Sequence, residues 1–157
     1  MERPDQLDAP WVRTLIKYGP RAQVTAFRLT NGRVGSRWRL FAGFRNPVPT
    51  LLLDHVGRSS GRTYTTPLLY LEDGRDLVVA ASQGGLPDHP QWYANLRSTP
   101  ETTVHVRGRG RLPVRARRAD EAERAGLWPR LVRLYPGFAD YQRWTEREIP
   151  VVVLEPR

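Results

Sequence analysis

Short apolar runs separated by polar, glycine-containing turns dominate the middle of the sequence. Residues 51–56, 65–71 and 77–81 are runs with the length and composition that favour β-strands. Residues 72–75 lie between the second and third runs and contain Asp-Gly, which is typical of a tight hairpin turn. The pattern therefore predicts neighbouring antiparallel strands.

Further strand-like runs follow in the second half and one precedes the first. Residues 102–107 and 111–117 alternate apolar and polar side chains around a glycine-containing turn, which predicts another hairpin. The arginines of this hairpin predict a charged outer face that discourages edge pairing. Residues 151–154 are a β-branched run typical of a buried final strand, and residues 33–41 can form a first strand.

Helix signals stand after the third strand run and after the second hairpin. Residues 90–96 can form a helix that opens at Pro90, with Asp88 or His89 as its capping residue. Asp120 is expected to cap a helix over residues 121–127, because Glu123 follows at the capping-box position. A separate segment over residues 129–134 can open at a proline.

Aromatic residues mark the last expected helix, residues 137–145. Pro136 disfavours helical backbone at Tyr135, so an extended residue is expected there. Four rings recur every three positions, which on a helix makes a ridge: Tyr135, Phe138, Tyr141 and Trp144. This ridge can be the seam by which the helix covers the sheet, or its phenols can line a substrate pocket.

The first 32 residues are expected to be a helical segment. Apolar and basic residues alternate at helical spacing between residues 11 and 30, and Gly19-Pro20 is expected to interrupt the helix. A helix packed on the sheet explains this pattern. A basic amphipathic segment that contacts an anionic membrane explains it too.

Composition narrows the class of protein. A chain of 157 residues without cysteine is one domain of ordinary size, with neither a disulfide frame nor thiolate chemistry. The three histidines are scattered, so no metal site is predicted. The charged start of the chain does not resemble a signal peptide, and no run is apolar enough to span a membrane, so a cytoplasmic protein is expected. These patterns together predict a mainly antiparallel β fold with peripheral helices.

The net charge of +9 raises the question of an anionic partner. Nearly all of the basic residues are arginine, and Lys17 is the single lysine. Nucleic acid is not favoured as a partner, because no recognised nucleic-acid-reading motif accompanies the charge. The remaining candidate partners are an acidic small ligand and an anionic membrane surface.

Two turns carry groups suited to an acidic ligand. In residues 57–62, glycines let backbone N–H groups approach a ligand, while Arg58, Ser59 and Ser60 offer side-chain donors. In residues 82–85, Ser82 and Gln83 are donors, and a helix start follows. Ordinary hairpin turns with solvated arginines would explain each turn taken alone.

Taken in order, several motifs resemble the deazaflavin-dependent nitroreductase family, which includes F420H2-dependent quinone and nitroimidazole reductases. The motifs are GRSSGRTYTTPLLY, VVAASQGG, HPQWYANL and LWPRLVRLYPGFADYQRWTEREIPVVVLEP. The resemblance spans roughly residues 33–157 and implies that these form a split β-barrel, FMN-binding-like domain that binds deazaflavin. It implies coenzyme F420 in its reduced form, F420H2, and a quinone or nitro compound as acceptor.

The resemblance also implies roles for individual residues. Those expected at the cofactor phosphate and acidic tail are Arg58, Ser59, Ser60, Gln91, Trp92, Tyr93 and Asn95. Helical spacing alone instead places Trp92 and Tyr93 on the buried face of their helix. Those expected along the deazaflavin ring are Thr65, Thr66, Pro67, Leu68, Ala80, Ala81, Ser82 and Gln83. Tyr135 is the expected donor to the acceptor oxygen, assisted by Tyr141 and Ser82.

Three departures from the family pattern qualify these expectations. Ser59 and Gln83 stand where lysine is familiar, which weakens the case for a long polyglutamyl tail. Phe138 stands where a third tyrosine is expected, which puts nitroimidazole reduction in doubt more than quinone reduction. Two other hypotheses stay open: a split barrel that binds FMN or another cofactor, and a non-catalytic basic binding module.

Overall fold

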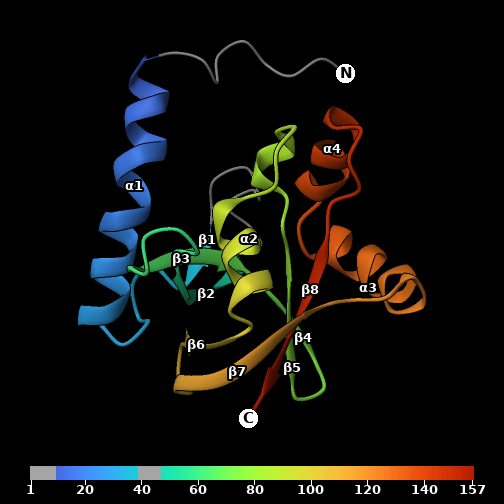
Figure 1. Ribbon diagram of the computed structural model, residues 1–157. Helices are drawn as coiled ribbons and strands as arrows, with labels where there is room; N and C mark the ends of the chain where they lie inside the picture. The colour runs from blue at the N-terminus through green and yellow to red at the C-terminus, as the bar shows by residue number, and fades with distance from the viewer. Residues whose placement is uncertain (1–9, 39–46) are drawn as a thin grey trace.

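The computed structural model describes residues 10–38 and 47–157. Its strands form one antiparallel sheet in the order β1-β2-β6-β7-β8-β5-β4, with β3 paired to β2 off that path (Figure 1). The strands are β1 (Arg37–Trp38), β2 (Val48–Val56), β3 (Thr63–Leu69), β4 (Leu71–Asp73), β5 (Asp76–Ala80), β6 (Glu101–Val106), β7 (Gly110–Arg118) and β8 (Val151–Pro156). The helices are α1 (Pro10–Leu29), the 3₁₀ turn η2 (Gln83–Gly85), α2 (Gln91–Ser98), α3 (Glu121–Leu134) and α4 (Gly137–Trp144).

Apolar side chains lie on both faces of the sheet. Leu77 and Val79 of β5 belong to a buried cluster that includes residues of α2, whereas Val78 and Ala80 belong to a second cluster with α3 and α4. Side chains alternate faces along a strand, so a strand covered on both sides is apolar throughout. The fold class predicted from the pattern, antiparallel β with peripheral helices, is confirmed.

The expected strand over residues 65–71 is divided in the structure. Its first part is β3, which pairs with β2 from Thr50↔Leu69 to Val56↔Thr63. Its last residue begins β4, which forms the expected hairpin with β5. The division lies at Tyr70, whose backbone N–H donates to Pro49 O (3.2 Å) and whose side chain is buried. A buried aromatic anchor therefore turns the chain from one strand to the next.

The prediction that the arginines of the second hairpin discourage pairing at a sheet edge is wrong. β7 is an interior strand with β6 on one side and β8 on the other. Arg117 of β7 donates to Glu155 Oε1 (2.6 Å) of β8 and through both terminal nitrogens to Glu123 (2.7 Å each) of α3. These contacts join the strand to the helix above it.

The helix boundaries correct three expectations. α1 runs unbroken through Pro20, and α3 runs unbroken through Pro129. A proline removes one helical hydrogen bond, but packing can outweigh this loss, and in α3 Leu127 and Leu131 are both buried around it. Pro90 itself is the N-cap of α2, in place of the expected Asp88 or His89.

Other helix predictions are confirmed. Asp120 accepts from the Glu123 N–H, and the Glu123 side chain accepts from the Asp120 N–H, so the capping box forms. Tyr135 is extended, with φ −142° and ψ 97°, between α3 and Pro136, the N-cap of α4. Of the first predicted strand, residues 33–41, only residues 37–38 form a strand, β1; residues 33–36 form a bend, and residues 39–41 lie outside the described part of the chain.

The helices flank the sheet on opposite sides in Figure 1. α1 stands along β3 at one side, α2 crosses the middle, and α3 and α4 lie at the other side. Side chains are described from residue 20 onward in α1. The second half of α1 forms a wall that faces β3 and the start of α2, and a cleft lies between them.

Candidate functional site

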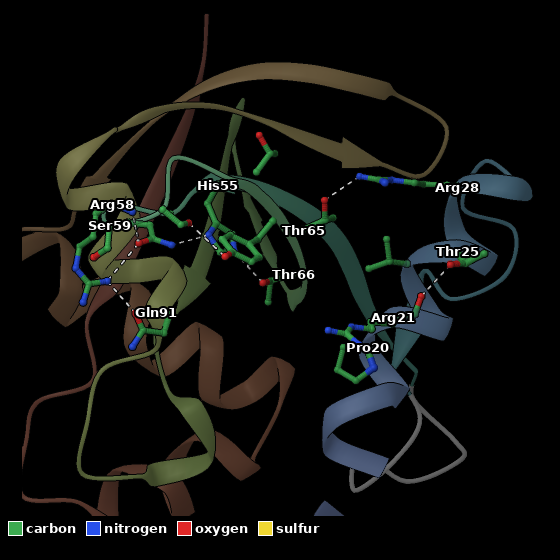
Figure 2. Close-up of a pocket in the computed structure, with 16 residues that line it drawn as sticks. Pro20, Arg21, Thr25, Arg28, His55, Arg58, Ser59, Thr65, Thr66 and Gln91 are labelled. Atoms are coloured by element: carbon green, nitrogen blue, oxygen red, sulfur yellow. Dashed lines mark hydrogen bonds between the residues drawn. The ribbon is translucent and has the colours of Figure 1, made fainter. Parts of the chain in front are cut away.

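A cleft of about 870 Å³ lies between α1, β3 and α2 (Figure 2). Ligand sites commonly measure about 300–1,000 Å³. The cleft is lined by Pro20, Arg21, Val24, Thr25, Arg28, His55, Gly57, Arg58, Ser59, Ser60, Thr63, Tyr64, Thr65, Thr66, Gln91 and Asn95. Three of these residues are arginines and none is acidic, so the described lining favours an anionic ligand.

The turn after β2 presents its polar groups to the cleft because of its glycines. Gly57 N–H donates to Arg62 O (2.8 Å), and Gly61 N–H donates to Gly57 O (2.8 Å), which closes the turn. A side chain at residue 57 would lie 2.5 Å from Ser60 Oγ, and Gly61 has φ +66°. Only glycine fits both positions without strain.

Arg58 is held against the start of α2. Its backbone N–H donates to Asn95 Oδ1 (3.1 Å), and its guanidinium donates to Gln91 Oε1 (2.8 Å) and to Asn95 Oδ1 (3.3 Å). Both partners are neutral amides, so the guanidinium keeps its full positive charge at the cleft. Figure 2 shows Arg58 and Gln91 together at one end of the cleft and α1 at the other.

His55 is a lining residue that sequence reasoning missed. Its side chain is 5% exposed, its ring stacks on Tyr64 at 5.7 Å, and both ring nitrogens have partners. Burial lowers the pKa of His55, and the neighbouring Asp54 opposes this shift. One buried histidine in a strand is a common structural feature, so the sequence carried no signal of its place beside Arg58.

The α1 wall was also missed, and one carboxylate ties it to the sheet. Arg28 donates to Thr65 Oγ1 (2.8 Å), and Thr65 Oγ1 in turn donates to Asp54 Oδ1 (2.6 Å). Arg111 of β7 donates to the other oxygen of Asp54 (2.7 Å). Arg28 also pairs directly with Asp54 Oδ1 (3.4 Å), so Asp54 partly offsets the charge of this wall residue, and Arg21 and Arg28 both lie on the cleft lining.

The second predicted turn, residues 82–85, lies against α4 instead of in this cleft. Arg147 supports it by donating to the carbonyl oxygens of Ala81 (3.2 Å), Ser82 (2.8 Å) and Leu86 (3.0 Å). A side chain at Gly85 would lie 2.8 Å from Tyr141 O, so this turn and α4 can approach each other only through glycine.

The aromatic ridge predicted over α4 is present. Neighbouring rings of the ridge have centroids 5.1 to 6.3 Å apart. Tyr135 is 2% exposed and its hydroxyl shares a hydrogen bond with Tyr141 Oη (3.0 Å). Burial, followed by this bond, raises the pKa of Tyr135. Tyr141 is half-buried and is therefore the more exposed residue of the pair.

The sequence-predicted site residues therefore fall into three groups. Those that line the cleft are Arg58, Ser59, Ser60, Thr65, Thr66, Gln91 and Asn95. Those near η2 and α4 are Ala80, Ala81, Ser82, Gln83, Tyr135 and Tyr141. Outside the cleft lining are Pro67 and Leu68, which are half-buried in β3, and Trp92 and Tyr93, which are residues of α2 with side chains buried in the core.

Residues 10–38 and 47–157 contain neither a cluster of metal-binding side chains nor a helix that could span a membrane. No group of three or more metal-binding side chains occurs in this part of the chain. No helix within it is both long and apolar enough to cross a membrane.

The sequence matches the family model for F420H(2)-dependent quinone reductase over residues 19–156. It is 52% identical over 119 residues to Rv3178 of Mycobacterium tuberculosis, named for the same activity, covering 76% of this chain and 99% of that protein. Rv1261c of the same organism, an F420H(2)-dependent quinone reductase, is 36% identical over 134 residues, which cover 83% of this chain and 85% of Rv1261c.

A solved F420-H2 dependent reductase has a similar structure. The TM-score is 0.62 at 37% identity, and the match covers 68% of this chain and 94% of that chain. This likeness confirms the split β-barrel that the sequence motifs implied.

Proposed function

Because this chain belongs to the F420H2-dependent quinone reductase family, we propose that it transfers a hydride from reduced coenzyme F420 to a quinone and that the cleft beside α1 receives the anionic part of the cofactor. The observation that carries the proposal is the cleft itself, which has three arginines and no acidic residue among its described lining. FMN and a non-catalytic role have no comparable support from the family match.

The donor set fits the acidic part of the cofactor. F420 carries a phosphate and a glutamyl tail, which need cations and short polar donors. Arg58, Ser59 and Ser60 are exposed in one turn, and Arg21 and Arg28 face them from α1. In our proposal the turn holds the phosphate and α1 holds the tail carboxylates.

When bound, reduced F420 supplies a hydride from its central ring carbon, and the protein's task is to orient the reactants and stabilise charge on the acceptor. Backbone groups near Ser82 are rigidly held by Arg147, so they can fix the ring edge. Tyr141 donates a hydrogen bond to the acceptor oxygen, and Tyr135 behind it orients that hydroxyl. Burial raises the pKa of Tyr135 further above neutral pH, so its hydroxyl is a donor throughout the working pH range.

A quinone is the acceptor that the family name supports, and nitro compounds are a further class. Membrane contact through the first half of α1 stays a prediction, because the side chains of residues 10–19 lie outside those described. It would bring the enzyme to a lipid-soluble quinone.

The direct test is oxidation of F420H2 by menadione, followed by the return of oxidised F420 absorbance. We expect turnover that requires both the protein and the quinone. NADPH and reduced FMN, supplied in place of F420H2 and each followed at its own absorbance, serve as controls and should give no rate above that without protein. Turnover with reduced FMN but not with F420H2 would contradict the proposal.

A further inference from the structure

His55 lies at the centre of a hydrogen-bond chain that crosses the floor of the cleft. Asn95 Nδ2 and His55 Nδ1 are 2.9 Å apart, and His55 Nε2 and Thr66 Oγ1 are 3.0 Å apart. Arg58 stands at one end of the chain, bonded to Asn95, and Thr66 at the other. Figure 2 shows His55 between Arg58 and Thr66, with the ends of the chain on the same cleft.

The direction of every bond in this chain follows from Arg58. Its backbone N–H and guanidinium can only donate, so Asn95 must turn its Oδ1 toward them. The Asn95 amide nitrogen then faces His55 and donates to Nδ1. A neutral ring that accepts at Nδ1 carries its proton on Nε2 and donates to Thr66 Oγ1.

The hydroxyl hydrogen of Thr66 is therefore left available to donate a hydrogen bond. Its oxygen accepts from His55, and its hydroxyl makes no second hydrogen bond within the described part of the chain. Thr66 lines the cleft, so that proton can point to an anionic oxygen held there. In a protonated His55 the Nδ1–H would face the Asn95 NH₂ group, so two donors would meet. Asn95 could avoid this only by flipping its amide, which would turn the NH₂ group toward the donors of Arg58. Burial favours the neutral ring by lowering the pKa of His55.

We propose that His55 is a positioning residue of the cofactor site, which fixes the Thr66 hydroxyl as a donor to a phosphate or carboxylate oxygen and secures Arg58 through Asn95. This assignment rests on the proposed function, because it takes the cleft to be the F420 site. In this proposal the buried His55 takes no direct part in hydride transfer. It sets the orientation of Arg58 and of the Thr66 hydroxyl, which lie at opposite ends of the hydrogen-bond chain.

The first test needs no cofactor. Long-range ¹H–¹⁵N spectra of histidine-labelled protein at pH 7 distinguish the two neutral tautomers and the cation, and loss of one signal in His55→Asn assigns it. We expect neutral His55 with its proton on Nε2. A proton on Nδ1, or a charged ring, would overturn the bond directions and the proposal with them.

The second test is a double-mutant cycle on F420 affinity, measured by fluorescence. His55→Asn places an amide where Nδ1 stood and keeps the Asn95 contact, whereas His55→Gln places it where Nε2 stood and keeps the Thr66 contact. Thr66→Val should weaken F420 binding roughly tenfold in the wild-type and His55→Gln backgrounds, but less than about threefold with His55→Asn. Thermal melts confirm that each variant is folded.

The outcomes separate the two claims. Equal losses from Thr66→Val in all three backgrounds, with wild-type binding intact, would show that His55 does not act through Thr66 and would overturn this assignment alone. A wild-type protein that does not bind F420 would contradict the proposed function and this assignment together, whatever tautomer the spectra report.

Discussion

Tyr141→Phe is expected to slow quinone reduction by roughly 10²–10³-fold at saturating F420H2, the usual cost of one lost transition-state hydrogen bond. Tyr141 is the more exposed residue of a hydrogen-bonded pair, because its partner Tyr135 is buried. Cofactor affinity should stay within about threefold, since only a hydrogen bond to the acceptor is lost. Steady-state oxidation of F420H2 by menadione measures the effect.

Two other variants make this prediction sharper. Tyr135→Phe removes only the partner that orients Tyr141, so a smaller loss, about 2- to 10-fold, is expected. Tyr70→Phe removes a hydroxyl from another buried tyrosine, at the β3–β4 junction, and should leave the rate unchanged. The opposite result would be a loss of rate of roughly 10²–10³-fold in Tyr135→Phe with a nearly normal rate in Tyr141→Phe. The donor would then be Tyr135, as the resemblance to the family implied.

Arg58→Ala is expected to weaken F420 binding at least about tenfold, because a charge-assisted contact contributes ~1.5–3 kcal/mol. Within the described part of the protein, the guanidinium is bonded only to the neutral amides of Gln91 and Asn95, so its charge is available to the cofactor. Fluorescence titration of F420 at physiological salt measures the affinity. The stability of the protein should change little, since the side chain is exposed.

Arg62 is the matched control for Arg58. It lies in the same turn and is also exposed, but it is not among the residues that line the cleft. Arg62→Ala removes the same charge from the same surface and should cost less than about threefold, as expected of a screened surface charge. Equal losses in the two variants would mean that the turn acts through net charge alone, and Arg58 would have no specific contact.

The parts of the fold that sequence could predict are those where one local pattern decides the structure. The Asp-Gly hairpin, the Asp120 capping box and the extended Tyr135 depend on neighbouring residues, and all three are found. The run over residues 77–81 reads as a buried strand because both of its faces pack against apolar side chains.

The errors occur where distant contacts outweigh local preference. Pro129 stays inside a helix that is anchored by buried leucines on either side of it. Tyr70 divides a continuous apolar run, because its burial and its bond to Pro49 suit a bend. In both cases tertiary packing decides, and the local sequence contains no sign of the distant partner.

The candidate site shows the same division. The turn that carries Arg58 was recognisable from its glycines, arginines and serines, and the resemblance to a family linked it to Gln91 and Asn95. The role of α1 as the opposite wall depends on Arg28 reaching Thr65, a contact across 37 positions of sequence. His55 shows its importance only through the geometry of its two bonds.

Hydrogen–deuterium exchange with and without F420 tests most directly whether the cofactor occupies the cleft between α1, β3 and α2. We predict slower exchange on binding in residues 57–66, in the second half of α1 and in α2, which surround the cleft. Residues 82–85 should be protected as well, if the ring reaches Ser82. Saturated binding that left residues 57–66 and α1 unchanged, with protection confined to η2 and α4, would contradict this location of the cofactor.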